Sequence, residues 1–322
     1  MYDKLVVITR RTRLEELIAR FNTVGQARFY IEHAGGDFAD YQREHDAYTR
    51  ALERVRREVE FGLPRQFLDR GLLPTYSFGP ADVIVTLGQD GLVANTAKYA
   101  GSLPIVGVNP DPARFDGILL PFTPPEAHAA VEQVLEGRAA TRAVTLAEAV
   151  LEDGQRLLAF NDLFIGARTH VSARYRLRAG GRDEIQSSSG VLVSTGAGST
   201  GWMSSVFNMA AGVAGFTGGR SGQAIRLEWE DRRLLYAVRE PFQSRQSGAD
   251  VVAGLVQPGE ELWLESRMPF GGVIFSDGIE SDFLDFNAGA IARVRAASQR
   301  AILVTAAMAP SKPRRQETLV HA

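Results

Sequence analysis

A glycine turn with a single carboxylate, Gly88-Gln89-Asp90-Gly91-Leu92, follows an apolar run at 81–87 and precedes a helical pattern. Glycines let a backbone approach a phosphate, and the first turn of a helix offers unpaired N–H groups with a partial positive charge. In an open α/β sheet, ligands bind at the carboxyl ends of the strands. The turn is therefore a candidate phosphate site in which Asp90 faces a substrate hydroxyl. The alternative is a tight turn in which Asp90 caps the helix.

A second glycine-rich loop, Gly196-Ala197-Gly198-Ser199-Thr200-Gly201, has the spacing of the dinucleotide-binding fingerprint. That fingerprint opens a βαβ unit and has an acidic residue about 20 positions later. Here the segment after the loop predicts β structure, and the first downstream acid is Glu228. An ordinary Rossmann site is therefore not indicated.

Ser199 also lies in a near match to the nucleophile elbow of serine hydrolases, which requires a later acid and then a histidine. The one histidine downstream is His321, close to the end of the chain, so this chemistry is excluded. The loop remains suited to hydrogen bonding with a polar ligand. A plain helix start, capped by Thr195, Ser199 or Thr200, is the alternative.

Two further polar groups are weaker candidates. Asn161-Asp162 follows the apolar residues 157–160, where an Asx turn is the default. Residues 276–282 hold three carboxylates, with Asp285 beyond them, which is compatible with a metal site but favours a solvated hairpin loop. The five histidines have no metal-ligand spacing.

The elements that position these groups follow from hydrophobic patterning. Apolar runs at 5–8, 81–87 and 104–108 predict buried strands of a parallel sheet. Helical patterns alternate with them at 14–21, 41–61, 92–100 and 126–136, while residues 29–31 fit either a strand or a helix. The alternation predicts an α/β fold with an N-terminal Rossmann-like, doubly wound domain over residues 1–127.

Residues 128–305 predict a β-rich second domain, because short apolar runs recur between glycine-rich turns. We expect its last segment to be able to pack back on the first domain, and residues 306–322 to form a tail. The expected strands cover residues 156–160, 172–178, 190–194, 224–229, 234–238, 261–265, 272–275, 290–296 and 301–305.

Composition narrows the class of protein. The 322 residues are 45% apolar and 23% charged, which is typical of a globular protein with a sizeable core. The net charge of −2 gives no reason to expect nucleic acid or an acidic membrane surface as a partner. The absence of cysteine excludes disulfides and thiol chemistry, and no apolar run has the length of a signal peptide or membrane span. We expect a cytoplasmic protein.

The order of the polar motifs resembles that of the NAD kinase family. Its motifs G-G-D-G-T, G-[IV]-N, N-E and T-x-T-G-S-T-A-Y correspond here to residues 88–92, 107–109, 161–162 and 195–202. The likeness covers residues 1–305 and is greatest to the mitochondrial-type branch, which has counterparts of residues 109–114, 188–190 and 285–290.

This resemblance implies transfer of the γ-phosphoryl group of ATP to the 2′-hydroxyl of the adenosine ribose of NAD, which gives NADP. Asp90 would accept the hydroxyl proton, and the nucleotide and phosphate loop would be Gly88, Gln89, Gly91 and Leu92. Asn161 and Asp162 would hold ribose hydroxyls. The other expected NAD-binding residues are Asn109, Thr195, Gly198, Ser199, Thr200, Gly201, Trp202 and Ser205. Mg²⁺ would accompany ATP with no tightly bound cofactor, and the protein would be a homodimer or a larger homo-oligomer.

Four positions depart from the family motifs. Gln89 replaces the second glycine, Leu92 a threonine, Asp162 a glutamate and Trp202 a tyrosine. Because two of these changes flank Asp90, two other functions stay open. One is an NAD(P)-binding sensor or scaffold without catalysis, and the other is a kinase of a lipid or sugar hydroxyl.

Overall fold

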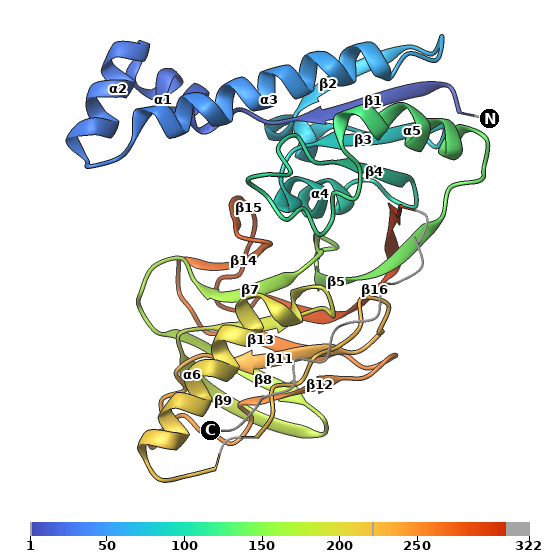
Figure 1. The fold of residues 1–322 in the computed structure, drawn as a ribbon. Helices are drawn as coiled ribbons and strands as arrows, with labels where there is room; N and C mark the ends of the chain where they lie inside the picture. The colour runs from blue at the N-terminus through green and yellow to red at the C-terminus, as the bar shows by residue number, and fades with distance from the viewer. Residues whose placement is uncertain (1, 221, 307–322) are drawn as a thin grey trace, which may run out of the picture.

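The computed structural model describes residues 2–220 and 222–306 (Figure 1). Its N-terminal region is built on four parallel strands in the order β2-β1-β3-β4. They are β2 (Arg65–Asp69), β1 (Lys4–Thr9), β3 (Asp82–Leu87) and β4 (Pro104–Val108). No helix in the described part of the chain is long and apolar enough to cross a membrane.

Helices cover both faces of this parallel sheet, as a doubly wound fold requires. Leu5 and Val7 pack in a core with α3 (Phe38–Glu58) and α5 (Ala127–Leu135), the latter preceded by the short turn η2 (Pro124–Glu126). Val6 and Ile8, on the opposite face, pack with α4 (Asp90–Ala97) and the turn η1 (Arg70–Thr75). Because alternate side chains of a strand point to opposite faces, continuous apolar runs are what such strands need. The predicted fold class is confirmed.

A helical arm lies beside the N-terminal end of α3 (Figure 1). It consists of α1 (Arg13–Phe21) and α2 (Val24–His33), and its own small core contains Leu14, Ala27 and Ile31. Residues 29–31, which fitted either a strand or a helix, are helical within α2.

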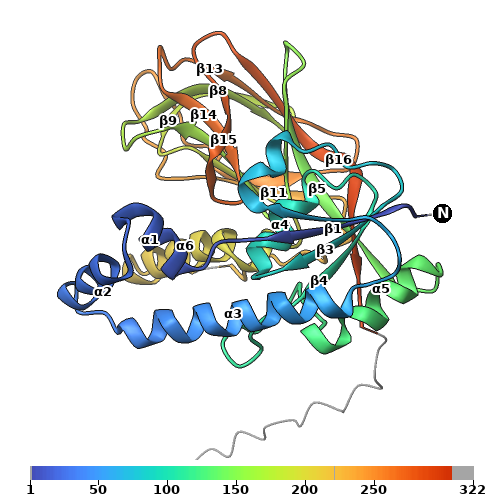
Figure 2. The same cartoon turned by 90° about the horizontal axis from the view of Figure 1, so that it is seen from above.

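The second region is a sandwich of two mostly antiparallel sheets (Figure 2). One sheet has the order β12-β11-β10-β7-β14-β15, and the other contains β16-β13-β8-β9 with β5 and β6 attached. The strands are β5 (Thr141–Leu151), β6 (Arg156–Ala159), β7 (Asp162–Ala167), β8 (Ala173–Ala179), β9 (Arg182–Ser188), β10 (Val191–Ser194), β11 (Leu234–Val238), β12 (Ala253–Val256), β13 (Leu262–Ser266), β14 (Gly272–Ser276), β15 (Ile279–Asp285) and β16 (Ile291–Val304).

A single helix, α6 (Trp202–Phe216), follows the short turn η3 (Gly198–Thr200) and covers the outer face of the six-stranded sheet. Along β10, Val191 and Val193 point into the core between the sheets, whereas Leu192 points outward to Met203 of α6. The sandwich therefore has three layers in this region: α6, the six-stranded sheet, and the sheet that contains β8, β9 and β13.

Strand β16 joins the two regions. It pairs antiparallel with β13 and β5 and then, after a register irregularity between Ala296 and Arg300, pairs in parallel with β4. One sheet therefore runs through both regions. The domain limits at residues 127 and 305 stay a prediction, and the expected tail lies outside the described residues except for residue 306.

Three expectations about the second region were wrong. Residues 224–229 form no strand, because the Leu227 N–H donates to Ser199 Oγ and the Glu228 carbonyl packs against Gly196. The two runs at 290–296 and 301–305 belong to one long strand, β16. The segment after residue 201 forms the helix α6 and no strand, although it lacks charged residues that would mark a solvated helix face.

Candidate functional site

The carboxylate of Asp90 sits at the first residue of α4, directly beyond the carboxyl end of β3. Its Oδ1 accepts a hydrogen bond from the Leu119 N–H at 2.6 Å. Within the described chain Oδ2 has no hydrogen-bond partner. The N-cap of α4 is Gln89, which makes no side-chain capping bond. Asp90 is thus not the helix cap that the alternative interpretation required, and one of its oxygens is available to a ligand.

The two departures that flank Asp90 have a structural explanation. Gln89 adopts φ −92° and ψ 166°, an extended conformation that any residue tolerates. Leu92 is 3% exposed and packs in the core between β3 and α4. A Cβ on Gly88 would lie 2.7 Å from Leu92 Cδ2, so Gly88 and Leu92 fit each other, whereas Gly91 faces open space.

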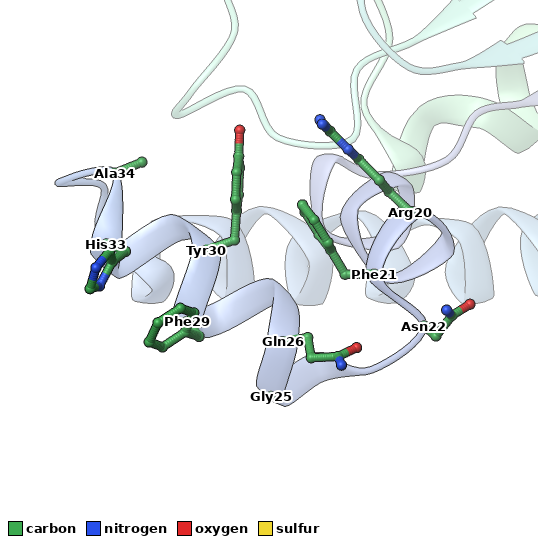
Figure 3. Close-up of a pocket in the computed structure, with 9 residues that line it drawn as sticks. All are labelled: Arg20, Phe21, Asn22, Gly25, Gln26, Phe29, Tyr30, His33 and Ala34. Atoms are coloured by element: carbon green, nitrogen blue, oxygen red, sulfur yellow. The ribbon is translucent and has the colours of Figure 1, made fainter.

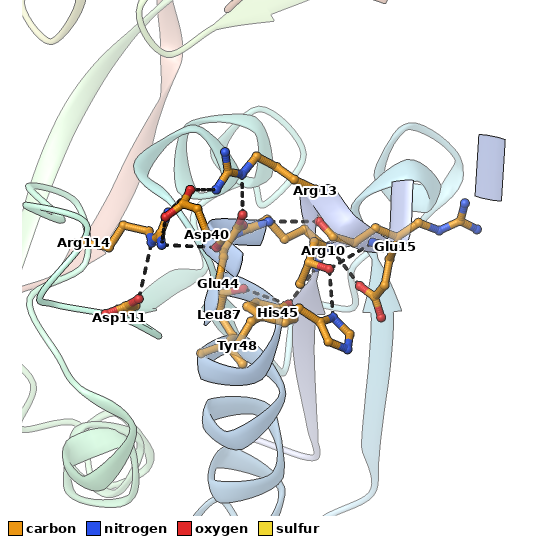
Figure 4. Close-up of polar contacts among 12 residues, drawn as sticks. Arg10, Arg13, Glu15, Asp40, Glu44, His45, Tyr48, Leu87, Asp111 and Arg114 are labelled. Carbon is orange, nitrogen blue, oxygen red and sulfur yellow. Dashed lines mark hydrogen bonds and ion pairs between the residues drawn. The ribbon is translucent and has the colours of Figure 1, made fainter. Parts of the chain in front are cut away.

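Contacts from α3 hold the end of β3 in place (Figure 4). The Tyr48 hydroxyl donates to the Leu87 carbonyl at 3.2 Å and accepts from the Arg10 N–H at 2.9 Å. Burial raises the pKa of Tyr48 to about 12, so the hydroxyl keeps its proton. The Arg114 and Arg13 guanidiniums beside Asp40 hold the pKa of that carboxyl well below its usual range. The bond from Tyr48 holds the Leu87 carbonyl in place, directly before Gly88.

Asn109, at the end of β4, is buried and shapes its own loop. Its Nδ2 donates to the Phe115 carbonyl at 2.9 Å, and its Oδ1 accepts from the Asp111 N–H at 3.1 Å. Gly117 has a positive φ of 62° and packs against this amide. Further along the same loop, the Leu119 N–H donates to Asp90. By shaping this loop, Asn109 therefore helps to position Leu119 against the Asp90 carboxylate.

A pair of carboxylates, Asp162 and Asp277, lies in the second region. Asp162, which begins β7, is 9% exposed, and its Oδ1 is a buried atom without a hydrogen-bond partner in the described chain. Burial, together with the charge of Asp277, raises the pKa of Asp162 to about 7. Burial raises the pKa of Asp277 too, although Asp277 accepts backbone N–H bonds from Phe160, Asn161 and Asp162 at 2.6–3.2 Å.

Asp277 lies at the tip of the β14–β15 hairpin with φ 54°. The hairpin was predicted, but not the contacts that Asp277, which is half-buried, makes with the backbone of residues 160–162. The sequence singled it out only as one of several acids in 276–282. A local signal was present in Asp277-Gly278, a dipeptide typical of tight hairpin turns.

The loop that precedes α6 uses its hydroxyls within the protein. Thr195 Oγ1 donates to the Phe160 carbonyl at 2.6 Å, and Ser199 Oγ donates to the Gly196 carbonyl at 2.7 Å. Both residues are buried. The N-cap of α6 is Gly201 without a side-chain bond, so none of the three expected hydroxyls caps this helix. A Cβ on Gly198 would lie 2.3 Å from the Asn161 carbonyl, so glycine here lets two backbones meet.

Six of the predicted residues meet in a cavity of about 390 Å³. They are Asn161, Asp162, Gly198, Thr200, Gly201 and Trp202. The sequence missed the other four residues that line it, which are Ala197, Phe275, Asp277 and Gly278. Trp202 stacks on Phe164, with ring centroids 5.8 Å apart, which fixes the indole at one edge of the cavity. Ser205, one turn into α6, is exposed and lies outside the lining.

Asp90, the rest of its turn and Asn109 do not line this cavity, but α4 connects the two places. Figure 1 shows α4 on the side of the first region that faces the second. Its side chains share one apolar core with Phe160 and with Ala197 of the loop. At its end, Lys98 Nζ lies 2.8 Å from Ser276 Oγ, and the Tyr99 hydroxyl bonds Asp282 of the hairpin. With a rise of about 1.5 Å per residue, α4 separates Asp90 from Lys98 by about 12 Å.

A different hollow lies on the α1–α2 arm (Figure 3). The rings of Phe21, Phe29 and Tyr30 face it, and its lining residues all fall between Arg20 and Ala34. It contains none of the predicted site residues and no carboxylate. It is therefore separate from the site built around Asp90 and Asp162.

Comparisons with known proteins point to one family. A stretch of 137 residues, 41% of the chain, is 32% identical to an NAD kinase from Chlorobaculum tepidum. A 138-residue stretch is 30% identical to an NAD kinase from Chlorobium phaeobacteroides. These alignments cover 44% and 45% of the relatives, so the chain spans less than half the length of the curated relatives it matches. No family model matches the chain.

Solved structures with a similar fold cover nearly all of the chain. A yeast NADH kinase complexed with NADH superimposes with a TM-score of 0.55 and 17% identity, over 95% of this chain and 84% of that one. An NAD kinase from Archaeoglobus fulgidus in complex with ATP gives a TM-score of 0.53 and 17% identity, over 94% and 93%. The chain thus resembles NAD kinases in local sequence and shares their fold, which confirms the resemblance that its motifs indicated; the mitochondrial-type branch stays a prediction.

Proposed function

We propose that this protein is an NAD kinase-like phosphotransferase that converts NAD to NADP with ATP-Mg²⁺ as the phosphoryl donor. The observation that carries the proposal is the position of Asp90. Its carboxylate is fixed through one oxygen at the start of α4, and α4 shares a core with the loop that lines a cavity together with Asn161 and Asp162. The curated relatives named NAD kinase support the same reaction.

The size of the site favours a long substrate. Asp90 begins α4, and Lys98, about 12 Å further along the helix, contacts Ser276 next to the cavity-lining Asp277. A dinucleotide can reach both places at once, whereas a monosaccharide cannot. One structural neighbour is complexed with NADH and another with ATP, which supports a dinucleotide acceptor and a nucleotide donor.

The proposed reaction forms one P–O bond and breaks one. The ribose 2′-oxygen attacks the γ-phosphorus of ATP, the bond to the β-phosphate oxygen breaks, and ADP leaves. The hydroxyl proton passes to Asp90 Oδ2 and then to solvent. Because phosphoryl transfer has a loose transition state, the proton is needed only late, and positioning contributes most of the rate. Mg²⁺ enters as part of the ATP substrate and neutralises charge on the phosphates.

The proposed roles of the other residues follow from their contacts. Gly88, Gln89, Gly91 and Leu92 shape the turn that receives phosphates, with Leu92 acting through the core. Asn161 and Asp162 hold ribose hydroxyls, since Asp162 Oδ1 lacks a partner in the described chain.

The residues of the loop before α6 fall into two groups, those that stabilise the loop and those that line the cavity. Thr195, Gly198 and Ser199 keep the loop in shape, whereas Thr200, Gly201 and Trp202 line the cavity and contact the adenosine part of NAD, with the exposed Ser205 beside them. Asn109 acts indirectly by shaping the loop that carries Leu119.

A cytoplasmic location and a homo-oligomeric state belong to the same proposal. The homo-oligomeric state rests on the family resemblance of the sequence motifs, and the location rests on the short apolar runs of the sequence.

NADP formation from NAD and ATP-Mg²⁺ tests this function directly, with an NADP-specific dehydrogenase as the readout. The wild-type protein should form NADP, and Asp90→Asn should lose at least about 100-fold of that rate, as expected for a general base. Asp3→Asn is the matched control, because Asp3 is an exposed carboxylate directly before β1. If wild type forms no NADP while NAD still raises the melting temperature, the protein binds dinucleotides without this catalysis and the proposal is wrong.

A further inference from the structure

Three arginines line a polar pocket that is separate from the site described above. The pocket has a volume of about 610 Å³, and Arg174, Arg245 and Arg267 line it together with Ser187 and Phe242. It lies on the outer face of the sheet that contains β8, β9 and β13. Figure 2 shows these strands on the opposite side of the sandwich from α6. None of the residues assigned to the NAD site lines it. We refer to it as the arginine pocket.

Strand pairing brings four of these residues into one row. The Arg267 N–H donates to the Arg174 carbonyl at 2.8 Å, Arg174 is paired with Ser187 across β8 and β9, and the Phe242 N–H donates to the Ser187 carbonyl at 2.8 Å. Residues directly opposite each other on neighbouring strands project from the same face of a sheet. Arg174 and Ser187 therefore project from one face, and Arg267 and Phe242 line the same pocket.

The loop that completes the pocket is held by its own hydrogen bonds. The Ser244 N–H donates to the Ser247 carbonyl at 2.9 Å, and the Ser247 hydroxyl donates to the Phe242 carbonyl at 2.6 Å. The Gly248 N–H donates to the Ile185 carbonyl of β9 at 2.9 Å. The tip of this tight turn presents Arg245 to the other two arginines.

The arginines of β8 differ in whether they have an acidic partner. Arg176 and Arg178 project from the same face as Arg174, and both form ion pairs with Asp183 of β9. In the part of the chain that the structure describes, Arg174 and Arg267 have no ion pair, although like charges opposite each other on neighbouring strands are unfavourable. Arg245 likewise has none there. An anionic ligand would supply the missing counter-charge.

We propose that the arginine pocket binds the diphosphate group of a nucleotide. The planar fork of each guanidinium suits two phosphate oxygens at once, and the Ser187 hydroxyl can donate a further bond. The Phe242 ring is 64% exposed at the edge of the pocket, where an aromatic base can stack on it. The site is independent of the proposed kinase reaction, because it shares no residue with it.

Isothermal titration with inorganic pyrophosphate, ADP and adenosine tests the site and separates its two parts. For the wild-type protein, both diphosphates should bind with an affinity that falls as salt rises, and ADP should bind more tightly than pyrophosphate. Arg174→Gln with Arg267→Gln should weaken pyrophosphate binding at least about tenfold, because two charge-assisted contacts are lost. Phe242→Ala should reduce ADP binding to the level of pyrophosphate.

The matched control is Arg57→Gln with Arg70→Gln, which makes the same change of charge at two exposed arginines of the first region. It should bind pyrophosphate as the wild type does. The charge-preserving pair Arg174→Lys with Arg267→Lys should retain part of the affinity, which separates a binding effect from misfolding. The proposal is overturned if the wild type binds neither diphosphate at millimolar concentration, or if the pocket variants and the control lose affinity equally.

Discussion

The two glycine-rich loops of this protein use their polar residues in different ways. The turn at residues 88–92 leaves a carboxylate oxygen of Asp90 available, while apolar packing of Leu92 fixes the backbone. The loop at 195–202 bonds Thr195 and Ser199 internally and offers the cavity Gly198, Thr200, Gly201 and Trp202. The first loop leaves a carboxylate oxygen without a partner in the described chain, and the second lines a cavity.

The glycines of the two loops make the comparison testable, and Gly198→Ala should have the largest effect of the variants described below. Its Cβ would lie 2.3 Å from the Asn161 carbonyl and 2.6 Å from Ser194 Oγ, so the backbone of the loop must shift. We expect a loss of about 3 kcal/mol in the free energy of unfolding, at the upper end for overpacking. Urea denaturation measures it. A loss below about 0.5 kcal/mol would show that the loop is not closely packed.

Asp277→Ala should have the next largest effect, because it removes the acceptor of three backbone N–H groups at residues 160–162. Buried donors left without partners cost about 1–3 kcal/mol, and alanine also tolerates the φ of 54° less well than aspartate. Urea denaturation should show a loss of about 2–3 kcal/mol. Asp277→Asn, which keeps an acceptor and suits that conformation, should lose less; an equal loss would contradict this explanation.

Thr195→Val should cost about 1–2 kcal/mol, since it leaves the Gly198 N–H without its acceptor at 3.2 Å in a buried position. Thr200→Val in the same loop replaces an exposed hydroxyl and should change the free energy of unfolding by less than about 0.5 kcal/mol. The melting temperatures of the two variants measure the difference. Equal shifts of the melting temperature would contradict the assignment of the Thr195 hydroxyl to an internal bond and the Thr200 hydroxyl to a ligand contact.

The pH dependence of stability should reveal the buried pair of carboxylates. Burial and the charge of Asp277 raise the pKa of Asp162 to about 7, whereas the pKa of an aspartate in the unfolded chain is about 3.9. Between about pH 4 and pH 7 the folded state keeps a proton that the unfolded state has released, so stability falls as the pH rises. Asp162→Asn should reduce this slope in urea denaturation series. An unchanged slope would contradict the assignment to Asp162.

Gly91→Ala should have the smallest effect and provides the contrast to Gly198→Ala. No atom lies within 4 Å of an added Cβ there, and Gly91 belongs to helix α4. Alanine in a helix is more favourable than glycine, so stability should stay the same or rise by about 0.5–1 kcal/mol. A drop in NADP formation without a drop in stability would then identify Gly91 as a place where substrate approaches the backbone.

The sequence predicted those elements whose patterning is local. The apolar runs of β1, β3 and β4 and the periodic helices around them have their signals within a few residues. The role of Leu92 could not be predicted from local patterning, because its burial depends on the sheet against which α4 packs. The segment 224–229 looked like a strand, but its backbone bonds the glycine loop, a contact across 28 residues of sequence.

The site, too, was predicted only in part. Asn161, Asp162 and the loop before α6 were named from motifs, and six of the named residues line one cavity. Asp277 was not identified, since a hairpin acid becomes a structural centre only through its contacts with residues more than 100 positions away. Thr195 and Ser199 were named as ligand contacts, yet their hydroxyls bond the backbone, a distinction that residue type alone does not carry.

The kcat and KM for NAD of Asp90→Asn and Thr200→Val, measured beside wild type in the NADP-forming assay, test the central claim most directly. If the Asp90 turn does the chemistry and the loop before α6 binds the dinucleotide, Asp90→Asn should lower kcat by at least about 100-fold with little change in KM. Thr200→Val should raise KM for NAD several-fold and leave kcat within about twofold. A loss of kcat in Thr200→Val with full activity in Asp90→Asn would contradict the account.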